Sequence, residues 1–182
     1  MLKSRKGDGR YLNSQRALNF SGVYEIEDYL DEVGKRVKLV DKGISRPNGV
    51  ALSADGSTLY ITETCTNTFT PSCPPSMNKI HQYSINLKHP SSKPKKVGVI
   101  RFHLDGVGHC DGLKVHSGTG LIVSSCPNGL CIIRPIVRDV RGELIAHVKL
   151  GEVATKISNI AFGRYYMYIT GEKHVWRIKL AQ

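Results

Sequence analysis

The chain has 182 residues, enough for one sizeable domain core. Its apolar and charged fractions are ordinary for a globular protein, and its apolar runs of a few residues are too short for a membrane-spanning helix. The formal net charge is +11, but the basic residues are spread along the chain and no aromatic residues interleave with them. This distribution favours a solvated basic surface over a nucleic-acid site or a membrane surface.

The N-terminus is basic from Met1 to Lys6, and no apolar segment follows it. This pattern does not fit a signal peptide, so a cytoplasmic location is expected. Residues 1–20 carry no strand pattern and are predicted to be an irregular N-terminal segment. Residues 21–182 are predicted to form one β domain.

Short β-rich runs separated by turn residues recur along this domain. Turn chemistry is explicit at Ser53–Ser57, Ser117–Gly120 and Asn128–Gly129, and one helical turn is predicted at Glu27–Asp31. The expected strands, in chain order, are Gly22–Glu27, Val37–Asp41, Gly49–Leu52, Thr58–Glu63, Lys79–Ile85, Lys96–Phe102, Gly112–Val115, Gly120–Ser124, Leu130–Arg134, Glu143–Leu150, Ile157–Phe162, Tyr165–Thr170 and Lys173–Lys179.

Three segments share one strand-turn-strand-strand pattern, and each opens on an Asn or Asp, namely Asn48, Asp111 and Asn159. The second start lies 63 positions after the first, and the third lies 48 positions after the second. A period of about 40–45 residues with four short strands per unit is typical of propeller blades. The longer first interval is explained by the Pro-, Ser- and Thr-rich insertion Cys65–Met77. The pattern predicts an all-β fold, a β-propeller.

The first strand of each propeller blade lines the central channel, so Asn48, Asp111 and Asn159 are expected to converge at the channel mouth. Oxygen-bearing side chains that converge from different blades suit a hard cation. The alternative for each residue is that it caps a turn, because Asn-Gly and Asp-Gly are common turn pairs. The recurrence in register favours a metal site.

The five cysteines are odd in number and match no zinc spacing. If Asn128–Gly129 is a two-residue hairpin turn, Cys126 faces Cys131 and a disulfide between them is geometrically possible. The alternative, two small residues packed across a hairpin, is favoured in a cytosolic protein. Cys65 and Cys73 pose the same choice, since a disulfide there would close a loop.

Three motifs are familiar in their order and spacing: Arg46–Thr64, Asp111–Val115 and Ser158–Gly163. The first closely resembles the regucalcin/gluconolactonase family. The second resembles the family's Pro-Asp-Gly-Leu motif, with Cys110 where Pro is usual, and the third resembles its Thr-Asn-Val-Ala-Phe-Gly motif. The resemblance covers roughly residues 20–180.

The resemblance implies a six-bladed propeller with a divalent cation in the channel, calcium first, with zinc, manganese or magnesium as alternatives. It implies that Asn48 is a metal ligand and that Asp111 is a metal ligand and the catalytic general base. It also implies hydrolysis of lactone-like esters, with a small-molecule lactone or ester as substrate. His109 is a further candidate for acid–base chemistry at the channel rim, with a surface loop histidine as its alternative.

The sequence also departs from the family, because the metal-binding Glu near the first blade and a further channel Asn motif do not occur. The chain is therefore expected to cover the last three to four blades, beginning near the end of the third. Two functions stay open at this point. One is a metal-dependent lactonase, which could be inactive as a truncated chain, and the other is a non-catalytic propeller that binds calcium or a protein partner.

Overall fold

The computed structural model describes residues 21–26, 37–64, 77–89, 91–104, 110–126, 129–136, 141–150, 157–171 and 173–180. Within these ranges the chain forms thirteen strands in four antiparallel sheets, and each expected strand overlaps one of them. No helix in these ranges is long and apolar enough to cross a membrane. The N-terminal segment 1–20, the helical turn at Glu27–Asp31 and residues 65–76 of the insertion lie outside the described residues.

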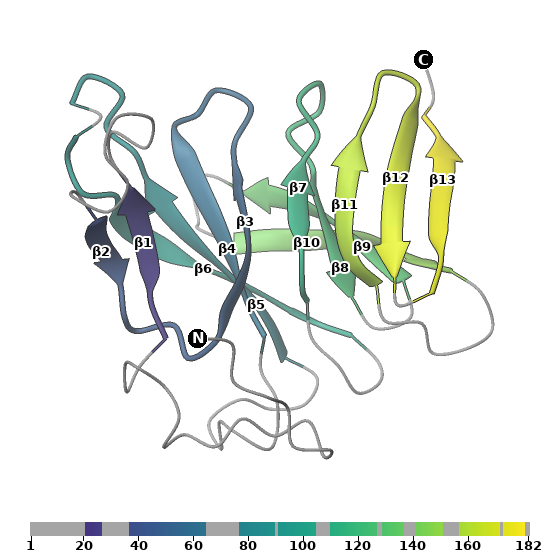
Figure 1. The fold of residues 1–182 in the computed structure, drawn as a ribbon, viewed down its shortest axis with the longest axis horizontal. Helices are drawn as coiled ribbons and strands as arrows, with labels where there is room; N and C mark the ends of the chain where they lie inside the picture. The colour runs from purple at the N-terminus through teal and green to yellow at the C-terminus, as the bar shows by residue number, and fades with distance from the viewer. Residues whose placement is uncertain are drawn as a thin grey trace.

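Each sheet is a meander in which the spatial order of the strands follows the chain (Figure 1). The first sheet pairs β1 (Val23–Ile26) with β2 (Val37–Asp41). The second contains β3 (Pro47–Leu52), β4 (Thr58–Glu63), β5 (Met77–Ser84) and β6 (Lys95–His103). The third contains β7 (Leu113–Val115), β8 (Ile122–Cys126), β9 (Gly129–Ile136) and β10 (Arg141–Lys149). The fourth contains β11 (Ile157–Phe162), β12 (Tyr166–Gly171) and β13 (Val175–Lys179).

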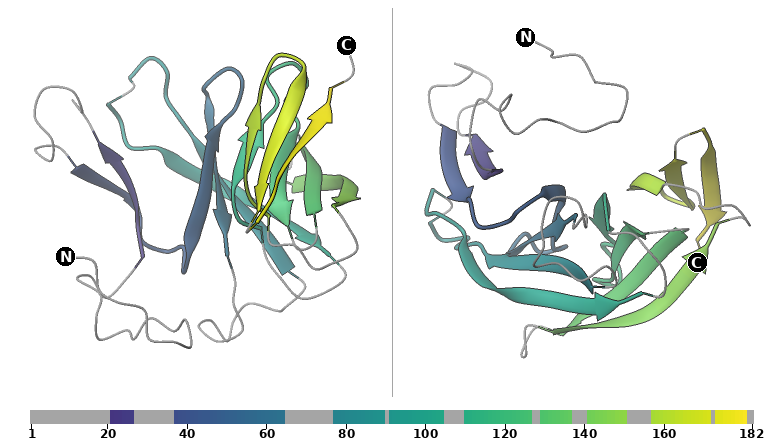
Figure 2. Two further views of the ribbon diagram at one scale, coloured as in Figure 1. Left: turned by 45° about the vertical axis from the view of Figure 1, so that its right-hand side comes forward. Right: turned by 90° about the horizontal axis from the view of Figure 1, so that it is seen from below.

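The sheets stand side by side as blades of a partial propeller. The first strands of successive sheets are neighbours, β3 beside β7 and β7 beside β11, while the last strands β6 and β10 are also neighbours. Figure 2 shows the same arrangement from below, where the sheets follow one another around an open arc with the first strands on its concave side. The predicted propeller is therefore confirmed.

Apolar side chains fill the spaces between neighbouring blades. Strand β8 shows how this works, because adjacent residues point to opposite faces of a sheet. Ile122 packs into the core shared with the β3–β6 sheet, and Val123 packs into the core shared with the β11–β13 sheet. A third core lies around Ile44 and Tyr83 and includes Val23 and Val40 from the first sheet. A central blade is thus buried on both faces.

The glycine after the opening polar residue allows successive inner strands to approach closely. A Cβ atom at Gly49 would lie 2.5 Å from the carbonyl oxygen of Asp111, and one at Gly112 would lie 2.5 Å from the carbonyl oxygen of Ser158. Real side chains do not tolerate such contacts with backbone atoms. The Asn-Gly and Asp-Gly pairs, which resemble turn signals in the sequence, therefore serve the packing of one blade against the next.

The conditional prediction, in which an Asn128–Gly129 turn places Cys126 opposite Cys131, is wrong. Gly129 is the first residue of β9 and pairs with Cys126, whereas Cys131 pairs with Ser124. The reason is steric, because a Cβ atom at Gly129 would lie 2.0 Å from the carbonyl oxygen of Val148 in β10. This glycine is required for close approach of two strands, so it does not serve as a turn residue. Both cysteines are thiols in the structure, and Cys65 and Cys73 lie outside the described residues.

Candidate functional site

The two predicted ligands, Asn48 and Asp111, lie together on the concave side of the arc. Asn48 is the second residue of β3, and Asp111 lies two residues before β7 of the next blade. The side chain of Asn48 lies near enough to the carboxylate of Asp111 to favour its ionised form. The expected convergence of these two side chains from neighbouring blades is therefore present, although their role as metal ligands stays a prediction.

The backbone around Asp111 is held by its own blade and by the blade on each side. The hydroxyl of Thr62 in β4 donates a hydrogen bond of 2.6 Å to the carbonyl oxygen of Asp111. The amide of Asp111 donates to the carbonyl oxygen of Ser125 at 2.9 Å, and the amide of Gly112 donates to that of Ser158 at 3.1 Å. The carboxylate is thus mounted on a short segment that has little freedom to shift.

The loss of hydration at the half-buried carboxyl group of Asp111 is only partly offset by its polar neighbours. Burial raises its pKa above the ordinary value, while the side chain of Asn48 and the positive charge of Arg46 act in the opposite direction. Burial outweighs both, so the ionised form is less stable here than in water. A cation beside this carboxylate would remove that penalty.

The donor chemistry of Asn48 fits such a cation. Its Nδ2 atom donates to the hydroxyl oxygen of Thr64 at 3.0 Å, which orients the amide group. The amide nitrogen therefore faces the protein, and the amide oxygen can serve as a neutral ligand beside the charged Asp111. Calcium and magnesium prefer carboxylate and carbonyl oxygens of this kind, but they take about six to eight ligands. No group of three His, Cys, Asp or Glu residues placed to hold a metal occurs in the described part of the chain.

The third predicted residue, Asn159, is placed differently. It is the third residue of β11, and its side-chain oxygen accepts a hydrogen bond of 2.9 Å from the amide of Ile160. That oxygen lies 2.8 Å from where a Cβ atom of Gly112 would stand, so it packs against the neighbouring inner strand. Asn159 thus lies next to the Asp111 segment, while its oxygen is engaged locally. His109 lies outside the described residues.

The sequence motifs did not reveal the role of the hydroxyl groups in the second strand of each blade. In each of three blades, a hydroxyl side chain of the second strand bonds a backbone carbonyl group of the inner strand or of the residues just before it. The pairs are Thr62 with Gly49, Ser124 with Gly112 and Thr170 with Asn159. The signal was available in the aligned repeats, where each second strand ends on a hydroxyl residue.

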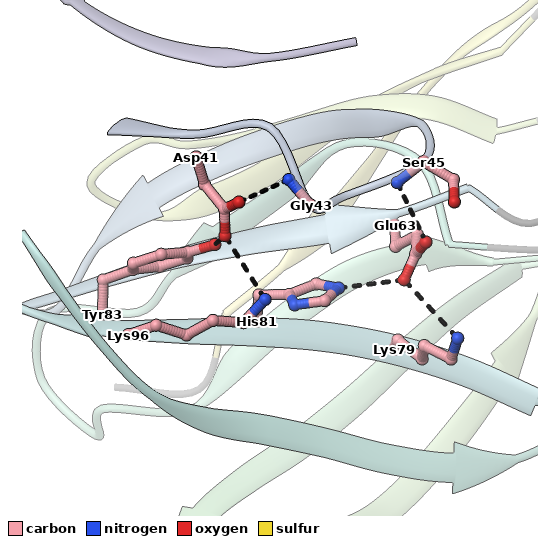
Figure 3. A network of polar contacts seen from close by, with 8 residues as sticks. All are labelled: Asp41, Gly43, Ser45, Glu63, Lys79, His81, Tyr83 and Lys96. Carbon is pink, nitrogen blue, oxygen red and sulfur yellow. Dashed lines mark hydrogen bonds and ion pairs between the residues drawn. The ribbon is translucent and has the colours of Figure 1, made fainter. Parts of the chain in front are cut away.

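A polar network between the first two blades occupies a separate place (Figure 3). Glu63 accepts hydrogen bonds from Nε2 of His81 at 2.9 Å and from the amide of Ser45 at 3.2 Å, and Lys79 lies 3.6 Å away. The hydrogen bond from His81 is the largest cause that lowers the pKa of Glu63, to about 2. A carboxylate with so low a pKa is a weak base, so Glu63 is no candidate for acid–base catalysis.

Asp41 extends the same network toward the first sheet. Its carboxylate accepts a short hydrogen bond from the hydroxyl of Tyr83 and lies 3.3 Å from Nζ of Lys96. Burial acts to raise the pKa of Asp41, but the bonds from Tyr83 and from the amide of Gly43, with the charge of Lys96, lower it overall. The same contact, together with burial, raises the pKa of Tyr83. The network thus ties β2 to β5 and β6.

Comparisons with known proteins agree with this architecture. The family model described as the SMP-30/gluconolactonase/LRE-like region matches residues 7–173. A curated gluconolactonase of Zymomonas mobilis subsp. mobilis is 25% identical over 169 residues, which cover 90% of this chain and 42% of that protein.

Solved structures show the same fold. A gluconolactonase of Xanthomonas campestris is 23% identical with a TM-score of 0.62, over 91% of this chain and 46% of that one. The calcium-binding protein regucalcin of Agrobacterium tumefaciens is 20% identical with a TM-score of 0.51, over 76% of this chain and 42% of that one. The chain spans less than half the length of these relatives. Because the family model matches most of its residues, the chain belongs to the SMP-30/gluconolactonase/LRE-like family.

Proposed function

We propose that this protein is a hydrolase of lactone-like esters and that Asn48 and Asp111 contribute ligands to a divalent cation, calcium before zinc, manganese or magnesium. The observation that carries the proposal is the proximity of these two side chains, which come from the neighbouring inner strands of successive blades. Family membership supports the reaction class, and the gluconolactonase name of the curated relative supports a small-molecule lactone as substrate.

The chemistry assigned to the chain's own residues is a proton transfer. Asp111 accepts a proton from the water that adds to the lactone carbonyl carbon, and the proton then passes to the ring oxygen as the ring C–O bond breaks. The product is the open hydroxy acid. Burial makes Asp111 a stronger base than an exposed Asp, because it raises the pKa of the carboxyl group. A bound divalent cation would polarise the substrate carbonyl.

Asn48 is assigned a positioning and binding role. Its amide nitrogen donates a hydrogen bond to the hydroxyl oxygen of Thr64, and this bond orients the amide group. The amide oxygen then remains available to bind a cation together with the carboxylate of Asp111. Substitution of Asn48 by Ala is therefore expected to weaken cation binding more than it weakens the fold, since the side chain is exposed.

A second function is favoured by the small number of donors. The described residues supply one carboxylate and one amide oxygen at this place, fewer than calcium takes up in proteins. A propeller that binds a cation or a protein partner without catalysis is consistent with this observation.

One pair of measurements distinguishes these functions. Proton release from an aldonolactone is followed at fixed pH with and without calcium chloride, and calcium binding is measured by calorimetric titration. Lactonase function requires calcium-stimulated turnover that Asp111→Asn abolishes and that the control Glu143→Gln, an exposed carboxylate paired with Arg134, retains. Calcium binding without turnover supports the non-catalytic propeller, and turnover that Asp111→Asn leaves unchanged refutes the assignment of Asp111.

A further inference from the structure

Three buried cysteines that play no part in the proposed reaction lie together beside the Asp111 segment. Cys110 directly precedes Asp111, Cys126 ends β8, and Cys131 lies in β9. Their exposed fractions are 0%, 3% and 0%. The Sγ atoms of Cys110 and Cys126 are 2.7 Å apart, and Cys131 belongs to the same buried cluster.

The sheet register explains why these thiols meet. Cys131 is opposite Ser124 in the β8–β9 ladder, and Cys126 is two residues beyond Ser124. Residues two apart on a strand share a face, so Cys126 and Cys131 are diagonal neighbours on one face of the sheet. That face packs against the β3–β6 sheet, and Cys110 enters the same core from the segment before β7.

The geometry of Cys110 and Cys126 suits a covalent bond. Their sulfur atoms are separated by only about 0.7 Å more than the ~2.0 Å length of a disulfide bond. The two residues are 16 positions apart and lie in the same blade, so bond formation would close a loop within one structural unit. We propose that Cys110 and Cys126 form an intrachain disulfide by exchange with a small-molecule disulfide such as oxidised glutathione.

The exchange is balanced in atoms and electrons. The thiolate of one cysteine attacks the small disulfide and releases one glutathione thiolate, which leaves a mixed disulfide on the protein. The thiolate of the second cysteine then displaces the second glutathione. The two protein thiols lose two protons and two electrons in total, and two molecules of reduced glutathione are formed. Cys131 keeps its thiol.

The burial of the two thiols determines the conditions under which this exchange can take place. Burial raises the pKa of the Cys126 thiol, and its contacts with Cys110 and Cys131 raise it further. A buried thiol with a raised pKa reacts slowly, because the thiolate is the nucleophile. The bond is therefore expected to form while the chain folds or when the blade opens locally, and in a reducing compartment it would remain open.

The bond would act on the segment that carries Asp111. The carbonyl oxygen of Cys110 accepts a hydrogen bond of 3.0 Å from the hydroxyl of Thr64, the same hydroxyl that accepts from Asn48. The amide of Cys110 donates to the side-chain oxygen of Asn78 at 3.0 Å. A covalent anchor at Cys110 is thus expected to restrain the backbone of Asp111, whether or not the proposed lactonase function holds.

The test uses the full 182-residue chain with Cys65→Ser and Cys73→Ser, so that three thiols remain. The protein is unfolded and refolded in a buffer of reduced and oxidised glutathione, and its thiols are then counted by alkylation in denaturant. We expect three thiols in the reduced protein and one in the oxidised protein, with Cys110 linked to Cys126 in the peptide map. Amide hydrogen exchange at Asp111 and Gly112 is expected to slow in the oxidised form.

Alanine variants of the three cysteines distinguish the possible disulfide pairs. Cys131→Ala should still lose both of its remaining thiols, whereas Cys126→Ala and Cys110→Ala should lose none, with circular dichroism to confirm that each variant folds. Three thiols after oxidative refolding, or a peptide map that links Cys131 to either partner, would overturn the proposal. Equal hydrogen exchange at Asp111 in the two forms would overturn the inferred restraint on this segment.

Discussion

The hydroxyl of Thr62 donates a hydrogen bond of 2.6 Å to the carbonyl oxygen of Asp111, although the two residues are 49 positions apart. Thr62 is fully buried, and its oxygen also accepts a hydrogen bond of 2.7 Å from the amide of Gly49. One side chain in β4 therefore satisfies backbone groups of its own blade and of the next. The position of the candidate ligand Asp111 depends on this contact between blades.

Replacement of Thr62 by Val should destabilise the protein by about 1–3 kcal/mol, because it keeps the shape but leaves two buried backbone groups without a partner. The free energy of unfolding in urea measures this. Thr170 occupies the equivalent place in β12, but it is exposed and its hydroxyl bonds only weakly to Asn159 at 3.3 Å. Thr170→Val is thus the matched control, and equal losses in the two variants would show that the contact between blades contributes nothing.

A methyl group at Gly49 should disturb the packing of two blades. Gly49→Ala places a Cβ atom 2.5 Å from the carbonyl oxygen of Asp111 and 2.7 Å from the amide of Leu113. Overpacking of this kind costs about 1–3 kcal/mol, measurable as a lower midpoint of thermal unfolding. Gly118→Ala is the control, since its Cβ atom would meet the side-chain ring of His116 at 3.3 Å from Cε1 and 3.8 Å from Nδ1, with no backbone atom as close. Equal midpoints for the two variants would contradict the steric account of Gly49.

Local patterns in the sequence were sufficient to predict the strands and the blade repeat. Runs of alternating or β-rich residues identified each strand that the structure describes, and the turn at Asp55–Gly56 is present with Gly56 at a φ of 74°. The proximity of Asn48 and Asp111 also followed from sequence, because equivalent positions of a repeat occupy equivalent places around an axis.

Contacts between distant segments were harder to predict. The register of β8 and β9 depends on how closely β10 approaches Gly129, which no spacing within the hairpin reveals. The meeting of Cys110 with Cys126 depends in turn on that register. Glu63 and His81 are 18 positions apart and become partners because β4 pairs with β5.

Glu63 should make stability depend on pH in the acid range. Its pKa is lowered from 4.5 to about 2 in the folded protein, first by the hydrogen bond from His81. A carboxyl group with a lowered pKa stabilises the fold fully above its unfolded pKa, and this stabilisation is lost as pH falls toward the folded value. Wild type and Glu63→Gln should therefore differ most above pH 4.5 and converge as the pH approaches about 2.

The expected difference at neutral pH is about 1.5–3 kcal/mol, the range for buried hydrogen bonds to a charged group. Urea unfolding at several pH values measures it. Glu143→Gln is the control, because the pair of Glu143 with Arg134 is 58% exposed on both sides and a surface pair of this kind contributes about 0–1 kcal/mol. A constant difference between wild type and Glu63→Gln across the acid range would refute the role of the ionised carboxylate.

Asp111→Asn should have opposite effects on stability with and without a cation. Burial raises the pKa of Asp111 above 3.8, so its ionised form costs stability once the pH rises through the raised folded value. Without calcium, the variant should be slightly more stable than wild type at neutral pH, and this advantage should vanish below about pH 3.8. With calcium at 100 times its dissociation constant, wild type should gain about 2.7 kcal/mol, while the variant should gain nothing.

Glu143→Gln, which changes the net charge equally, should respond to calcium as wild type does. An equal calcium response in Asp111→Asn would place the cation elsewhere, and a variant less stable than wild type in calcium-free buffer would contradict the desolvation of this carboxylate.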